Sequence, residues 1–136
     1  MIKSKFAINL HILTLLADNQ NEWLSSNYIA GSLNINPVLV RKEISSLKSA
    51  NIVESKEGNS GGLKLNKNPE DINISDIFLI TKGKSNVFSL SKNAPNPHCQ
   101  IGKKINENLM SLFEDIDESI KMQLKNITLE DFRKKF

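Results

Sequence analysis

Residues 25–65 constrain the fold more than any other part of the chain, because two short helical patterns are followed there by a glycine-rich hairpin. Ser25 or Ser26 can cap the first helix, and the pair Asn36-Pro37 is a typical start for the second. The short segment between the two helices leaves room only for a tight turn. This order predicts a helix-turn-helix unit.

The second helix of this unit has one narrow apolar stripe, formed by Val40, Ile44 and Leu47 at helical spacing. The opposite side carries small, polar and basic side chains, which can enter the major groove of DNA and hydrogen-bond base edges and phosphates. These outward-facing residues are Val38, Arg41, Lys42, Ser45, Ser46 and Lys48. Every amphipathic helix has a polar face, so this segment alone leaves an ordinary surface helix open as an interpretation.

The hairpin that follows favours a DNA-recognition helix over an ordinary surface helix. Segments 52–55 and 63–65 have the composition of β-strands, and Gly58, Gly61 and Gly62 lie between them. We expect these glycines to give the tip positive φ angles and to let backbone N–H groups approach a phosphate or the minor groove. A glycine turn alone is usually only a turn, but its position after the helix pair predicts the wing of a winged helix-turn-helix domain.

Apolar periodicity predicts three more helices. The first, over roughly residues 4–17, is apolar on most faces, so we expect it to be buried and His11 to be a hydrogen-bonded core residue. A short second helix has Ser75 as its expected cap, and the segment 81–98 is loop-like. The third helix is long and begins at Ile101.

The long helix has one sustained apolar face, formed by Ile101, Ile105, Leu109, Leu112, Phe113, Ile116, Ile120 and Leu124. A small winged domain cannot cover a face of this length. The apolar face of the long helix therefore predicts a homodimer that presents two recognition helices to a palindromic site on double-stranded DNA. The alternative is a helix folded back over its own domain. After it, Thr128 and Asp131 have the spacing of a capping pair, which predicts a final turn of helix.

The chain's one cysteine, Cys99, lies beside His98 just before the long helix. As a nucleophile it would need a base and a group to orient that base, and adjacent side chains seldom point at each other, so a thiol enzyme is the weakest interpretation. A second interpretation is that Cys99 is a redox or electrophile sensor, whose thiolate would be stabilised by the helix N-terminus. As a structural residue, it would be buried and would pin the loop.

Composition limits the remaining options. A chain of 136 residues with a net charge of +3 fits one domain with an appended element and permits a nucleic-acid partner. A single cysteine excludes an internal disulfide framework and fits a reducing compartment, which predicts a cytoplasmic protein. The apolar N-terminal run is interrupted by Asn9, His11 and Thr14, so it predicts a helix of the folded domain with no role in a membrane.

The order of these segments resembles the Rrf-two (Rrf2) family of bacterial transcriptional regulators over essentially the whole chain. The resemblance rests on YIAGSLNINPVLVRKEISSLKSANIVES, the GNSGGLKL wing, PEDINISDIF, NPHCQIG before the long helix, and the closing NITLEDF. It implies a dimeric winged helix-turn-helix protein, usually a repressor, with the recognition helix from Pro37 to Lys48 and NITLEDF packed against the partner subunit. Arg41 falls where the family places a base-contacting side chain.

Two departures from the family pattern bear on mechanism. Glu57 occupies a wing position where the family commonly has an arginine. Cluster-binding members have three cysteines before the long helix, whereas this chain has only Cys99, so we expect no iron-sulfur cluster and no other metal or cofactor. The signal would then be an oxidant or a small molecule.

The sequence therefore predicts a mainly α fold with a small β wing: a winged helix-turn-helix domain plus a long C-terminal dimerisation helix. We expect residues 1–82 to form the DNA-binding domain, residues 83–100 a connecting loop, and residues 101–136 the dimerisation helix and tail. The function is expected to be sequence-specific transcription regulation without enzymatic activity, and the alternative is a winged-helix module that binds protein. The expected DNA contacts are Lys3, Lys5, Ser26, Asn36, Val38, Arg41, Lys42, Ser45, Lys48, Lys56, Gly58, Asn59, Gly61 and Gly62, with Lys64 as a further wing lysine.

Overall fold

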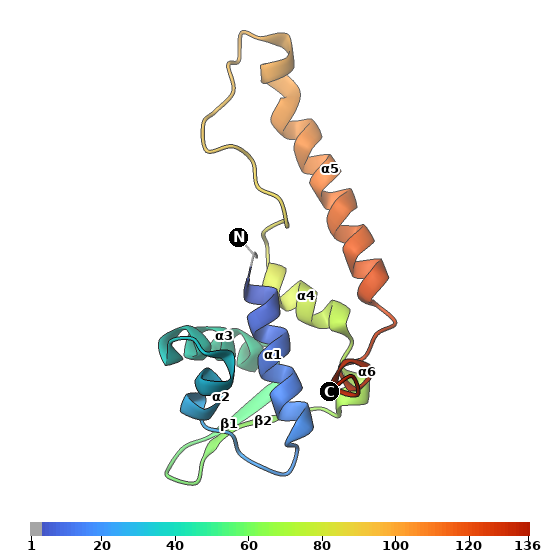
Figure 1. The fold of residues 1–136 in the computed structure, drawn as a ribbon. Helices are drawn as coiled ribbons and strands as arrows, with labels where there is room; N and C mark the ends of the chain where they lie inside the picture. Colours follow the sequence, from blue (N-terminus) through green and yellow to red (C-terminus); the bar gives the residue numbers. More distant parts are fainter. Residues whose placement is uncertain (1–3) are drawn as a thin grey trace.

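A computed structural model describes residues 4–136, which form six α-helices, one 3-10 helix and a two-stranded antiparallel sheet. In chain order the elements are α1 (Lys5–Asp18), α2 (Ser26–Leu33), α3 (Pro37–Ser49), β1 (Val53–Lys56), β2 (Gly62–Leu65), η1 (Pro69–Asp71), α4 (Ile74–Lys82), α5 (Gln100–Leu124) and α6 (Leu129–Arg133). Figure 1 shows that all elements except α5 gather into one body, and that α5 projects from it. The predicted fold class is confirmed.

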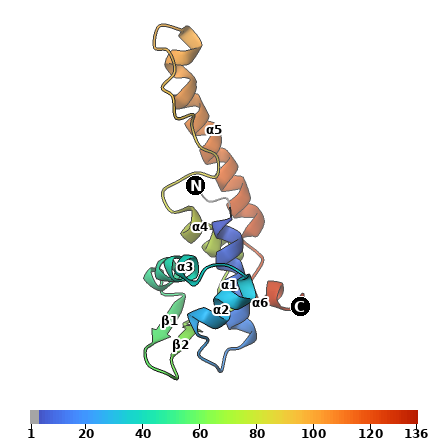
Figure 2. The ribbon, with the colours of Figure 1, turned by 60° about the vertical axis from the view of Figure 1, so that its left-hand side comes forward.

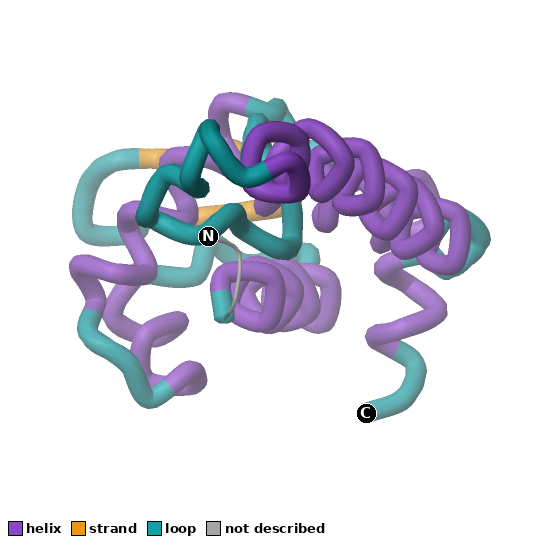
Figure 3. The backbone as a smooth tube through the Cα atoms, turned by 90° about the horizontal axis from the view of Figure 1, so that it is seen from above, coloured by secondary structure: helices purple, strands orange, loops and turns teal. Residues whose placement is uncertain are grey.

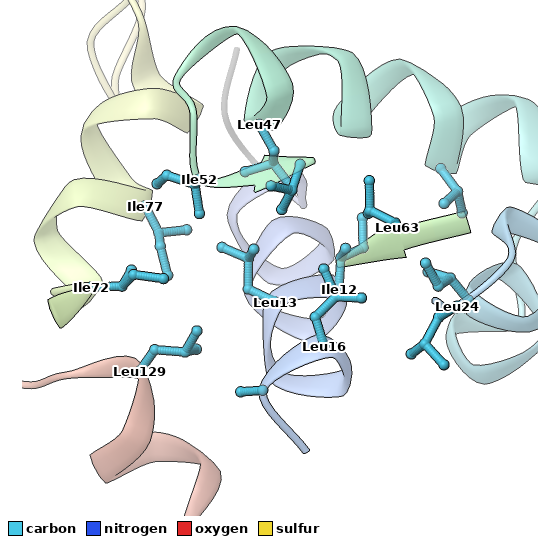
Figure 4. Packing of buried hydrophobic residues seen from close by; sticks show 14 of the residues in the cluster. Ile12, Leu13, Leu16, Leu24, Leu47, Ile52, Leu63, Ile72, Ile77 and Leu129 are labelled. Atoms are coloured by element: carbon cyan, nitrogen blue, oxygen red, sulfur yellow. The ribbon is translucent and has the colours of Figure 1, made fainter. Parts of the chain in front are cut away.

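The hydrophobic core surrounds α1, which contacts α2, α3, α4, β2 and α6. Ile12, Leu13 and Leu16 of α1 are almost completely buried. Figure 4 shows them among side chains from the other elements, including Leu47, Leu63, Ile72, Ile77 and Leu129. The helix that supports the recognition unit is therefore also the centre of the core.

Only one side of α1 is buried, so the expectation of a core histidine is wrong. The buried residues of α1 lie on one arc of the helix, and His11 lies outside that arc. Its exposed ring is hydrogen-bonded to Ser32 of α2, with Nε2 and Oγ 3.0 Å apart. The polar residue that α1 does bury is Asn9, whose Nδ2 donates to Thr81 Oγ1 of α4 at 2.9 Å.

Helix α4 begins one residue before its expected cap. Asn73 is the N-cap, and its backbone N–H donates to the Asp76 carboxylate at 3.1 Å. Ser75 is buried inside the helix, so the prediction that it caps α4 is wrong. Asn73 and Asp76 have the spacing of a capping box, so the helix begins at Ile74 and Ser75 lies within its first turn.

The C-terminal segment returns to the body of its own chain. The backbone N–H of Leu129 donates to Ile72 O at 2.8 Å, and the Leu129 side chain is fully buried. Arg133 forms ion pairs with Asp18 of α1 and with Glu130, and its hydrogen bond to Glu130 lowers the pKa of that carboxyl. The expectation that this segment packs against a partner subunit is therefore wrong for Leu129, which lies in its own chain's core. The predicted Thr128–Asp131 capping pair is confirmed.

Helix α5 is attached to the body at its C-terminal half and by the loop 83–99, which runs beside it (Figure 1). Asp117 is buried on α5; its Oδ1 accepts a hydrogen bond from the Val87 backbone N–H at 3.2 Å, and its Oδ2 lies 3.6 Å from Lys82 Nζ. Phe113 packs against Phe88 of the loop, with ring centroids 6.0 Å apart. Phe113 is thus buried by its own chain, and its expected place on a free dimer face is wrong.

The rest of the apolar face of α5 is less covered. Ile101 is 71% exposed and Leu112 is 52% exposed, and Ile105, Leu109, Ile116, Ile120 and Leu124 are half-buried. Figure 3, which looks down on the molecule, shows α5 along one side of the body.

Among residues 4–136, no helix combines the length and apolar character that a membrane crossing requires.

Candidate nucleic-acid interface

The helix-turn-helix unit is held by local hydrogen bonds that the sequence predicts. Ser25 Oγ accepts from the Tyr28 backbone N–H at 3.0 Å and so caps α2. Asn36 Oδ1 accepts from the Val38 backbone N–H at 2.8 Å and caps α3, with Pro37 as the first helical residue. Between the helices, Asn34 has a φ of 55°, a left-handed conformation that asparagine tolerates better than most residues. The predicted tight turn is confirmed.

Helix α3 has a buried side and an exposed side, as its apolar stripe predicts. Val40 and Leu47 are fully buried and Ile44 is half-buried. The residues expected to contact DNA are all exposed: Asn36 at the cap and Val38, Arg41, Lys42, Ser45 and Lys48 on the helix. Leu39, Ser46 and Ser49 are exposed as well. Figure 2 shows α3 and the wing at one edge of the body, with α5 extending away from it. The exposed side of α3 is thus free to enter a groove of DNA.

The wing is a short antiparallel hairpin, in which Val53 pairs with Leu65 and Lys56 pairs with Gly62. Gly58 and Gly62 have φ angles of 101° and 151°, which favour glycine. The expected positive φ is not found at Gly61. Glycine is required there for another reason, because a Cβ atom would lie only 2.0 Å from the Lys56 carbonyl oxygen.

Trp23, which was not among the residues predicted to matter for DNA binding, lies beside the two strands of the wing. The Lys64 Nζ atom is 4.9 Å from the centroid of the Trp23 ring, and the Lys56 Nζ atom is 5.8 Å from it. Beside it, Leu24 and Leu63 exchange two backbone hydrogen bonds, of 2.8 and 3.0 Å, and so join this segment to the hairpin. Cation–π attraction to one ring restrains both wing lysines. The sequence feature that pointed to Trp23 is that it is the chain's single tryptophan and lies in an otherwise polar segment.

The remaining expected DNA contacts are not all brought together. Lys56, Gly58 and Asn59 are exposed on the wing, whereas Gly61 and Gly62, at the turn end of the second strand, are half-buried. Ser26 is half-buried in the first turn of α2. Lys5 begins α1 at the end that lies away from the wing (Figure 1), and Lys3 lies outside the described residues.

Cys99 is exposed and caps the N-terminus of α5, far along that helix from the recognition unit (Figure 1). Its Sγ accepts a hydrogen bond from the Gly102 backbone N–H at 3.4 Å. The interpretation of Cys99 as a buried residue that pins the loop is therefore wrong. The neighbouring His98 is also exposed, and its backbone N–H donates to Asn96 Oδ1 at 2.9 Å.

Comparison with known proteins points to one family. The sequence pattern of the Rrf2 family, described as "Iron-dependent Transcriptional regulator", matches residues 2–135. YwnA of Bacillus subtilis, described as a "Putative HTH-type transcriptional regulator", is 38% identical over 131 residues, which cover 96% of each chain.

Solved structures have the same fold. IscR from T. potens superposes with a TM-score of 0.70 at 25% identity, covering 97% of this chain and 85% of that one. CymR, the global cysteine regulator of Bacillus subtilis, superposes with a TM-score of 0.71 at 24% identity, covering 98% of this chain and 95% of that one.

The residues of this chain do not fit a resident iron centre. An iron-sulfur cluster is held mainly by several cysteine thiolates, and this sequence contains one cysteine. Over the described part of the chain, no group of three His, Cys, Asp or Glu side chains is close enough to hold a metal ion.

Proposed function

Because this chain belongs to the Rrf2 family of transcriptional regulators, we propose that it represses transcription as a homodimer bound to a palindromic DNA operator. DNA binding and transcription regulation follow from the family, and the same assignment excludes a thiol enzyme. The observation that carries the proposal is the exposed basic side of α3, which lies beside a wing whose two lysines are restrained on Trp23.

In this proposal α3 enters the major groove. Arg41 donates to the edge of a guanine, because its planar guanidinium can bond O6 and N7 together. Lys42 and Lys48 bind phosphates, and Ser45 lies between them on the same side of the helix. The cap at Asn36 holds the first turn of α3 in place for these contacts.

The wing supplies contacts outside the major groove. Lys56 and Lys64 place positive charge on its two strands, and Gly58 and Asn59 bring its tip close to the sugar-phosphate backbone. The acidic Glu57 at the tip opposes deep insertion between phosphates. Ser26, Gly61 and Gly62 are further contacts through hydroxyl or backbone groups.

The homodimer is supported by the face of α5 that the body leaves uncovered. Ile101 and Leu112 expose most of their apolar side chains on a helix that projects from the body. Pairing two copies along this face removes that surface from water. The buried Asp117, tied to Lys82 and to the Val87 backbone, holds α5 on the body and so sets the spacing of the two recognition helices.

Arg41→Ala is expected to weaken operator binding by about 1 to 3 kcal/mol and to reduce the preference for the operator over random DNA. Lys42→Ala is its matched control on the same helix side, and should weaken binding to both DNAs alike while lowering the salt dependence. The measurement is the affinity of each variant for a selected operator and for a random duplex over a salt series. Equal effects of both substitutions on both duplexes would contradict these roles.

We further propose that Cys99 makes the repressor responsive to oxidants or electrophiles. Its thiol is exposed, and it caps the helix on which dimerisation depends, so a modified thiol changes the end of α5. Diamide or peroxide is expected to release wild-type protein from its operator and to leave Cys99→Ser bound. Both proteins should bind equally under reducing conditions, which is the control. Identical binding of the wild type with and without oxidant would exclude the switch.

A further inference from the structure

Two large apolar side chains are exposed on the first turn of α3, where a DNA-binding helix is expected to be polar. Val38 is 60% exposed and Leu39 is 51% exposed. Neither packs as part of the core, and neither side chain can hydrogen-bond a base or a phosphate. A binding partner with apolar groups would remove these side chains from water, and DNA, the partner in the proposed function, has such groups.

Val38 lies on the same side of the helix as the residues proposed to bind DNA. Arg41, Lys42 and Ser45 follow it by three, four and seven positions, which is the spacing of one helix face. The fully buried Leu47 lies nine positions after Val38, which places it on the opposite side. If the basic residues face DNA, Val38 therefore faces the base edges.

The structure also gives Val38 a fixed orientation. Its backbone N–H donates to the Asn36 side chain at 2.8 Å, so the first turn of α3 is held in register. A β-branched side chain on a helix strongly prefers a single χ1 rotamer. Val38 thus presents two methyl groups at a defined position, with little conformational entropy to lose on contact.

The major groove exposes one apolar group on its base edges, the C5-methyl of thymine. We propose that Val38 is a specificity residue that recognises a thymine in each half of the operator by packing its isopropyl group against that methyl. The basic residues around it hold the helix against the phosphates, and the apolar contact selects the base. This inference rests on the proposed function, because Val38 can contact the thymine only if α3 lies in the major groove.

The test uses the full-length protein and an operator selected from random duplexes. Thymines of the half-site are replaced by uracil one at a time, symmetrically in both halves, which removes only the C5-methyl. At one position we expect about fourfold weaker binding per half-site, since burial of one such group contributes about this factor, and about fifteenfold for the symmetric pair. Val38→Ala should bind more weakly than wild type and lose its sensitivity to uracil at that position only.

The controls separate this inference from the proposed function. Val38→Thr keeps one methyl group at the site and should retain part of the sensitivity, and Leu79→Ala removes a comparably exposed apolar side chain from α4 and should retain all of it. If the wild type binds its operator but no uracil position weakens it, or if Val38→Ala keeps the full uracil effect, thymine recognition by Val38 is wrong while the proposed function stands. If no duplex is bound above the non-specific level, the proposed function fails and this inference fails with it.

Discussion

Leu112→Asp is expected to convert the homodimer into a monomer and to weaken operator binding about a hundredfold or more, because bivalent attachment is lost. Leu112 is 52% exposed on α5, so the substitution places no charge in the core of the subunit. In a twofold dimer each such change occurs twice at one interface. Burying unpaired carboxylates there costs several kcal/mol for each ion, on the order of the stability of a modest interface. Sedimentation and operator binding measure the two effects.

Met110→Asp is the matched control, since it adds the same charge to the same helix. Met110 precedes Leu112 by two positions, which places it about 160° around the helix from Leu112. It is 38% exposed, and the substitution is expected to leave the dimer intact. A wild-type protein that sediments as a monomer, or a Leu112→Asp protein that remains a dimer with unchanged affinity, would refute the proposed interface.

Leu129→Ala is expected to lower the free energy of unfolding by about 2 to 5 kcal/mol, the usual range for a fully buried leucine. The side chain has no exposed surface, and Figure 4 shows it near Leu13 of α1, Ile72 and Ile77 of α4. Ile127→Ala is the control in the same segment, because Ile127 is 37% exposed and its loss should cost less than about 1 kcal/mol. Urea unfolding followed by the fluorescence of Trp23 measures both. Equal and small losses would show that α6 does not pack in the core in solution.

The recognition unit was predictable because its determinants are local. The caps at Ser25 and Asn36 act on backbone groups two or three residues away, so the residue types alone mark where α2 and α3 begin. The apolar period of α3 likewise assigns its buried and exposed sides. The wing followed from glycines whose backbone conformations few other residues adopt, although Gly61 is required by a close backbone contact and not by its φ angle.

The wrong expectations for Phe113 and His11, and the failure to predict a role for Trp23, have a different cause, which is contact between residues far apart in the chain. Phe113 belongs to the apolar face of α5 by its period, but Phe88 of the preceding loop covers it. His11 lies in an apolar segment, yet only one arc of that helix meets the core. Trp23 carried no motif, and its role became visible only when the hairpin brought Lys56 and Lys64 over its ring.

The order of the elements, the winged helix-turn-helix unit and the residues that its recognition helix exposes follow from the sequence alone, since capping and periodicity act over a few residues. Contacts between distant segments set which parts of the apolar surface remain free. They place Leu129 in the core of its own chain, tie Asp117 to the body and leave Ile101 and Leu112 uncovered. Burial depends on which distant segments meet, and a helical period specifies a face without specifying what covers it.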